Sequence, residues 1–132
     1  MREILFRGKT KSGSWAEGNL LVYPDVNRMY IQTGDYFKGG AVEVKRASVG
    51  QYTGLKDKNG KKIFEGDILG SRYDDIFPDH VTFEVVEWAQ NAWCLRYQTC
   101  DPDVIPDEDV LPYSEVIGNI HDNPALLEGG VK

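Results

Sequence analysis

Short apolar runs separated by Gly, Asn, Asp and Pro dominate the chain, and this texture predicts strands joined by turns. The segment after residue 41 shows the two-residue period of a half-buried strand most clearly, because valine alternates there with Glu and Lys. In the N-terminal part we expect strands at residues 3–9, 15–23, 29–33 and 42–46. The pattern therefore indicates a β structure at the start of the chain.

The C-terminal part continues in the same way, and its best strand pattern is VTFEVVEW followed by AWCLRY. Strands are predicted at residues 62–64, 68–70, 81–88, 92–97 and 116–120, with the proline-rich segment 101–112 as a surface loop or edge. Tight turns are predicted at residues 57–60, 65–67 and 90–91, since Asn-Gly and Gly-Asp pairs accept the backbone angles that turns need.

One short helical turn is expected near the C-terminus, with Asn123 as N-cap and Pro124 as the first helical residue. No three-turn amphipathic helix is found in the sequence. We place a joint at Gly50–Gly54, which divides the chain into an N-terminal β region, 1–50, and a second β region, 51–132, unless both form one compact unit. The prediction is a mainly β protein.

Composition narrows the class of protein. The chain has 132 residues, 41% of them hydrophobic, so it can bury a core without disulfides or metal ions. The net charge of -6 disfavours nucleic-acid binding, which usually depends on a basic face. No run approaches the ~20 apolar residues of a membrane span, and the first residues lack a signal-peptide pattern. We expect a cytoplasmic protein that does not bind membranes.

Three segments carry a family resemblance. VGQYTGLKDKNGKKIFEGDIL at 49–69 resembles the signature of the YopX family of phage and prophage proteins. REILFRGKTKSGSWAEGNL at 2–20 resembles the N-terminal hairpin of that family, and EVIGNIHDNPALL at 115–127 is similar to its C-terminal signature. The three matches follow one another in the family's order.

The resemblance implies an N-terminal β region and a C-terminal part like a small SH3-type barrel. It also implies an oligomer-forming phage or prophage protein in a bacterial host. No biochemical activity is established for the family, so no catalytic residues are carried over. The positions that match its pattern are Gly54, Asp57, Gly60, Gly66, Asp67, Gly118, Asn119, His121 and Pro124.

Three carboxylates, Asp57, Glu65 and Asp67, would suit Mg²⁺, which prefers oxygen ligands. The alternative is structural, because Asp commonly accepts hydrogen bonds from backbone amides in a turn before a strand, and we favour it. No catalytic, cofactor or metal site is predicted.

The two histidines and two cysteines add little chemistry. His80 and His121 each adjoin an Asp and could form an oriented general base, but neither has an obvious nucleophile nearby, so we expect capping or solvent-facing roles. Cys94 and Cys100 are too far apart for a CxxC pair, and Cys94 is expected in or near the core.

Two charged surfaces are candidates for binding. The hairpin lysines Lys56, Lys58, Lys61 and Lys62 could meet single-stranded nucleic acid if Tyr52 and Phe64 stacked on bases, or could simply solvate a hairpin tip. The acidic run from Asp101 to Asp109 could dock a basic partner or mimic nucleic acid, or be a solvated loop, which is the commoner case.

Tryptophan and tyrosine are numerous for so small a core, so some of them are expected at an interface between copies of the chain. The favoured hypothesis is a non-enzymatic, self-assembling accessory protein of a phage or prophage that binds a host or phage macromolecule. One alternative is a nucleic-acid-associated β-barrel module that uses the Lys56–Lys62 hairpin. The other is an enzyme that uses Asp67 or His121.

Overall fold

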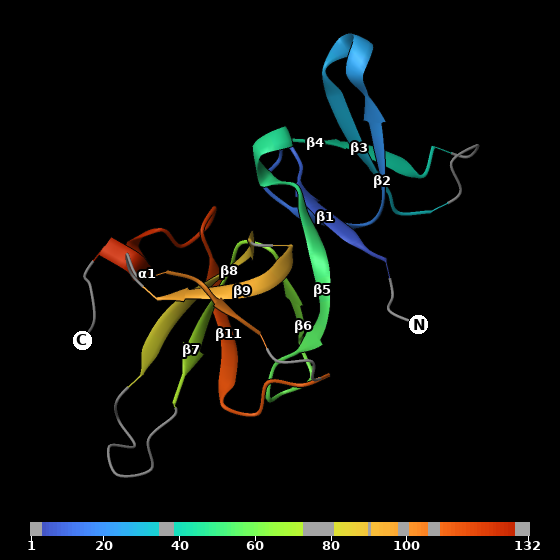
Figure 1. The fold of residues 1–132 in the computed structure, drawn as a ribbon. Helices are drawn as coiled ribbons and strands as arrows, with labels where there is room; N and C mark the ends of the chain where they lie inside the picture. Colours follow the sequence, from blue (N-terminus) through green and yellow to red (C-terminus); the bar gives the residue numbers. More distant parts are fainter. Residues whose placement is uncertain are drawn as a thin grey trace. The chain divides into compact units, whose positions relative to one another are not determined.

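The computed structural model describes residues 4–34, 39–72, 81–89, 91–97, 101–105 and 109–128. The chain divides into two compact units, Met1–Tyr52 and Thr53–Lys132, and each is described by itself. Both consist of antiparallel strands (Figure 1). Within these ranges no helix has both the length and the apolar character needed to cross a bilayer.

The first unit is a curled antiparallel sheet with the strand order β4-β3-β2-β1-β5. Its strands are β1 (Phe6–Lys9), β2 (Trp15–Tyr23), β3 (Arg28–Gln32), β4 (Ala41–Val44) and the start of β5 (Gly50–Lys56). Two 3-10 turns, η1 (Pro24–Val26) and η3 (Arg46–Ser48), follow β2 and β4.

The sheet of the first unit bends back on itself. Thr10, just after β1, forms an isolated bridge with Val44, and the Lys45 amide donates to the Lys9 carbonyl at 2.8 Å. Ile31 and Val44 are buried on the inner face. Because of this curl, one end of β4 is partly paired rather than left as an open edge.

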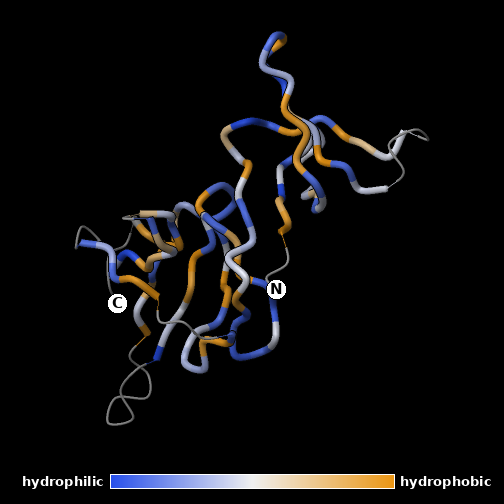
Figure 2. Tube along the Cα trace, turned by 45° about the vertical axis from the view of Figure 1, so that its right-hand side comes forward, coloured by the Kyte–Doolittle hydropathy of each residue, from blue (hydrophilic) through white to orange (hydrophobic). Residues whose placement is uncertain are grey.

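The second unit holds a five-stranded antiparallel sheet with the order β10-β9-β8-β7-β11. Its elements are the rest of β5, β6 (Lys62–Phe64), β7 (Asp67–Ser71), β8 (Thr82–Ala89), β9 (Ala92–Tyr97), β10 (Asp103–Val104), β11 (Ser114–Asn119) and α1 (Ala125–Glu128). Hydrophobic and hydrophilic residues are interspersed along the chain (Figure 2), as strands with one buried face require.

The core of the second unit collects side chains from the β5–β6 hairpin, the sheet and the segment before β11. Its buried members are Leu55, Ile63, Leu69, Val86, Ile105 and Leu111. Trp93, Leu95 and Val116 pack against them. Each fully buried aliphatic side chain contributes about 1.5–3 kcal/mol, so this cluster is the main source of stability in the unit.

The mainly β prediction is confirmed, and so is the short helix near the C-terminus. Strands β2, β6 and β9 have the predicted bounds. The sheet of the second unit does not close into a complete barrel. The joint predicted at Gly50–Gly54 includes the point at which the chain divides into the two units, between Tyr52 and Thr53, although these residues form most of β5 rather than a turn. The glycines suggested a break, whereas Gly54, with φ +86°, lies inside the strand. That the two halves are separate folding domains stays a prediction.

Candidate functional site

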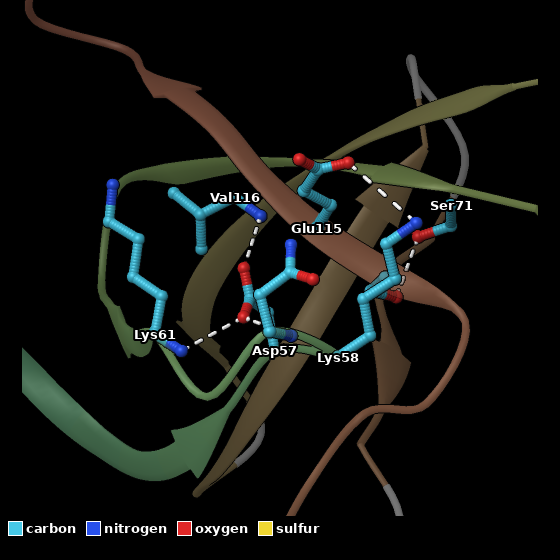
Figure 3. A network of polar contacts seen from close by, with 8 residues as sticks. Asp57, Lys58, Lys61, Ser71, Glu115 and Val116 are labelled. Atoms are coloured by element: carbon cyan, nitrogen blue, oxygen red, sulfur yellow. Dashed lines mark hydrogen bonds and ion pairs between the residues drawn. The ribbon is translucent and has the colours of Figure 1, made fainter.

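Asp57 directly follows strand β5, and its side chain is buried. One carboxylate oxygen accepts the backbone amides of Asn59 and Lys61, each at 2.9 Å, which closes the predicted turn. The other accepts the amide of Val116 in β11, also at 2.9 Å (Figure 3). A single side chain therefore shapes its own turn and joins it to a strand 59 residues further along the chain.

These contacts change the acidity of Asp57. Burial by itself raises the pKa of the carboxyl, but the amides of Val116, Lys61 and Asn59, together with the Lys61 charge, outweigh it. The pKa of Asp57 is therefore below its ordinary value. A carboxylate held in this way is ionised at neutral pH, and its oxygens are occupied by backbone donors.

The turn and β11 are joined by further bonds around this carboxylate. The Lys58 amide donates to the Ser114 carbonyl at 3.0 Å, and the Lys58 ammonium lies 3.8 Å from the Glu115 carboxylate. The buried hydroxyls of Ser71, on β7, and Ser114 are 2.8 Å apart. Hydrogen bonds and an ion pair therefore connect the turn after β5 to strand β11.

The turn Glu65-Gly66 is joined to the sheet in a similar way. Gly66 has φ +89°, a conformation that favours glycine, and its amide donates to the Val86 carbonyl at 2.9 Å. Its carbonyl accepts the Ile120 amide at 2.9 Å. Asp67 is buried, and its carboxylate accepts the Phe64 amide at 2.7 Å. Asp67 thus makes a backbone hydrogen bond of the kind that the structural interpretation predicts.

The loop after β11 is organised by Asn119. Its side-chain oxygen accepts the amides of His121 and Asp122, at 3.0 and 2.9 Å. The Asn123 side-chain oxygen accepts the Asn119 amide at 3.2 Å. The same oxygen lies against Gly118, where an added Cβ atom would be only 2.5 Å from it. The carbonyls of Asn123 and Pro124 accept the first backbone hydrogen bonds of α1, so the helix begins where the sequence predicts.

The two segments that carry the family pattern are thus joined within the second unit, although 51 to 70 positions separate their pattern residues in the sequence. Contacts between Asp57 and Val116, and between Gly66 and Ile120, connect them. What the structure brings together is a set of backbone contacts. Among the described residues, no three His, Cys, Asp or Glu side chains are grouped closely enough to hold a metal ion.

The remaining candidate residues are placed as follows. His121 is half-buried and lies beside Gly66, with its Nε2 atom 3.6 Å from where a Gly66 Cβ would be. Cys94 is fully buried, as predicted, and is not in a disulfide. His80 and Cys100 lie outside the described residues.

The hairpin lysines do not form the predicted stacking surface. Lys56, Lys58 and Lys61 are exposed, but the rings of Tyr52 and Phe64 are 6% and 3% exposed and cannot receive bases. The stacking part of that hypothesis is wrong, because both rings fill core positions on β5 and β6.

A different surface in the first unit was missed by sequence reasoning. An apolar groove of about 400 Å³ is lined by Leu21, Tyr23, Val26, Arg28, Tyr30 and Ala41. The Tyr23 and Tyr30 rings meet edge to face, with centroids 5.4 Å apart. The available signal was that LLVYPDV keeps apolar residues at consecutive positions, so both faces of β2 carry them.

A comparison with protein families matches residues 5–128 to the family described as "YopX protein". The match spans nearly the whole chain, and it includes both segments that meet around Asp57 and Gly66. The chain belongs to the YopX family. The resemblance inferred from three segments of the sequence is therefore confirmed.

This member of the YopX family also has a solved structural neighbour. It is similar to the crystal structure of protein EF1440 from Enterococcus faecalis, with 25% sequence identity and a TM-score of 0.57. The similarity covers 96% of this chain and 99% of the other, so it extends over both units. A comparison with curated proteins finds no match.

Proposed function

We propose that this YopX-family protein is a non-enzymatic binding protein that assembles with copies of itself and serves as an accessory protein of a phage or prophage. The observation that carries the proposal is that polar side chains of the family pattern bind the protein's own backbone. Asp57 and Asp67 bind backbone amides, and Asn119 builds a loop. These bonds give three polar residues of the family pattern a role in the fold.

Binding is supported by the groove in the first unit and by exposed aromatic residues. Tyr23, Trp88 and Tyr113 are 39%, 54% and 60% exposed, respectively. Large aromatic side chains on a surface are typical anchors of protein interfaces. In a small β protein, self-association would bury these aromatic side chains and also cover exposed strand edges. Phage or prophage origin is supported by the family alone.

Light scattering coupled to size-exclusion chromatography tests the proposal. We expect the mass of the eluted species to exceed the 14.9 kDa of the chain and to rise with concentration through the micromolar range. A mass that stays at the monomer value at every concentration would contradict self-assembly.

A further inference from the structure

The groove of the first unit lies on the face of the sheet that points away from its core. Leu21 is paired with Tyr30 and Tyr23 with Arg28 across β2 and β3, so these four side chains share one face. Ile31, fully buried, points to the opposite face. An antiparallel sheet normally presents polar residues on its second face. Here Leu21, Tyr23 and Tyr30 form an apolar patch on a face that also carries Asn19, Gln32 and Glu43. An exposed apolar patch with polar neighbours suits a partner.

The rim of the groove is cationic. Arg28 is exposed and shares the Glu43 carboxylate with Lys11, at 3.7 and 3.8 Å, so two cations face one anion. Arg46 donates to the Asn27 side chain, next to the groove residue Val26. Among the described residues, Asp25 precedes the groove residue Val26 in the sequence and adds a second carboxylate. The groove therefore combines an apolar floor with a small excess of positive charge.

Charge is unevenly divided between the two units. Residues 1–52 contain eight Lys and Arg against five Asp and Glu, a net charge of +3. Residues 53–132 contain seven against sixteen, a net charge of −9. The first unit of one molecule and the second unit of another are thus electrostatically complementary, whereas two second units repel each other.

A short segment of the second unit has the chemistry that the groove would take. Strand β10 is an edge strand of two residues, Asp103 and Val104, and both are exposed. Val104 is 54% exposed, and Asp101 and Asp103 place carboxylates just before it. A groove of about 400 Å³ is near the lower limit of ligand pockets, a size that suits one or two side chains.

We infer that the groove of one molecule binds the 101–105 segment of a second copy, with Val104 in the apolar groove and Asp103 facing Arg28. This inference rests on the proposed self-assembly and specifies which two surfaces meet in it. The two surfaces differ, so the contact is head to tail. Its charge pairs are exposed, and it weakens as salt shortens the Debye length from ~10 Å at 0.1 M to ~3 Å at 1 M.

Two charge reversals, Arg28→Glu and Asp103→Lys, test the inference by sedimentation velocity. Each single variant is expected to raise the dissociation constant of assembly by about tenfold or more. An equimolar mixture of the two should recover assembly, because contacts through the native Arg28–Asp103 pair then alternate with contacts through the charge-reversed pair. The double variant Arg28→Glu/Asp103→Lys should recover assembly through the reversed pair.

Control variants distinguish failure of the groove–segment contact from failure of self-assembly itself. Lys45→Glu makes the same charge change on an exposed position of the first unit outside the groove lining, and it should assemble like the wild type. Val26→Ser and Val104→Ser remove an exposed apolar side chain from each surface without altering charge, and both should weaken assembly. If Asp103→Lys and Val104→Ser assemble normally, the segment is not the occupant and this inference is wrong, while self-assembly stands. A strictly monomeric wild type would overturn both.

Discussion

At the scale of single residues, chemically suggestive side chains such as Asp57, Asp67 and Asn119 accept hydrogen bonds from backbone amides. The turn after Asp57 was predictable, because Asn59-Gly60 is a local signal. The bond from Asp57 to the Val116 amide was not, because nothing in the sequence specifies which distant donor a buried carboxylate will meet. Local chemistry is readable from the sequence, whereas long-range partners depend on the packing of the whole unit.

Replacing Asp57 by Asn tests its structural role. The amide group of Asn has one acceptor oxygen where the carboxylate has two, so at least one buried backbone donor loses its partner. We expect the free energy of unfolding at neutral pH to fall by about 2 kcal/mol, measured by urea denaturation. The exposed Asp103→Asn is the control, with an expected change within about 0.5 kcal/mol.

The same pair of proteins predicts a pH dependence. The pKa of Asp57 is lower in the folded than in the unfolded state, so its stabilisation is present above the unfolded value, about 3.9. It is lost as pH falls through the folded pKa. The stability difference between wild type and Asp57→Asn should therefore shrink in acid. A difference that stays constant into strongly acidic solution would show that the charge of Asp57 contributes nothing.

At the scale of elements, strands and hairpins followed from the apolar pattern, but two features did not. Strand β5 was missed because glycine was interpreted as a break, although Tyr, Thr and Leu in the same segment favour a strand. The crowding at Gly118 was also invisible, because it results from the Asn123 side chain folding back over β11. Glycine in a sequence does not distinguish a turn from a close approach.

Gly118→Ala tests that close approach. The new methyl group would displace the Asn123 side chain and cost about 1–3 kcal/mol in thermal or urea unfolding. In an Asn123→Ala background the obstacle is gone, and the same substitution should cost less than about 1 kcal/mol. Equal costs in both backgrounds would mean that the Asn123 side chain is not the reason for glycine at this position.

The β8–β9 hairpin gives a second test at this scale. Asn91 has φ 60°, in the left-handed region that glycine and asparagine accept more readily than branched residues. Asn91→Gly should leave stability unchanged or slightly higher, whereas Asn91→Val should lower it by about 1–2 kcal/mol. The comparison is made by thermal unfolding, and similar melting temperatures for the two variants would refute the assigned backbone conformation.

At the scale of the whole molecule, sequence reasoning identified the family and the β class but did not find the groove of the first unit. The lysine hairpin attracted attention because its charges are adjacent in the sequence. The groove of the first unit draws its lining from β2, η1, β3 and β4, so only the folded sheet assembles it. We therefore assign stability to the contacts around Asp57 and Gly66, and propose that association uses the groove.

Sedimentation equilibrium on three proteins tests that division most directly. The wild type should associate in the micromolar range, and Asp57→Asn should associate with the same constant at neutral pH despite its lower stability. Tyr30→Ala, which removes a groove wall, should weaken association by about tenfold or more. Loss of association in folded Asp57→Asn with retention in Tyr30→Ala, or a wild type that stays monomeric throughout, would contradict the account.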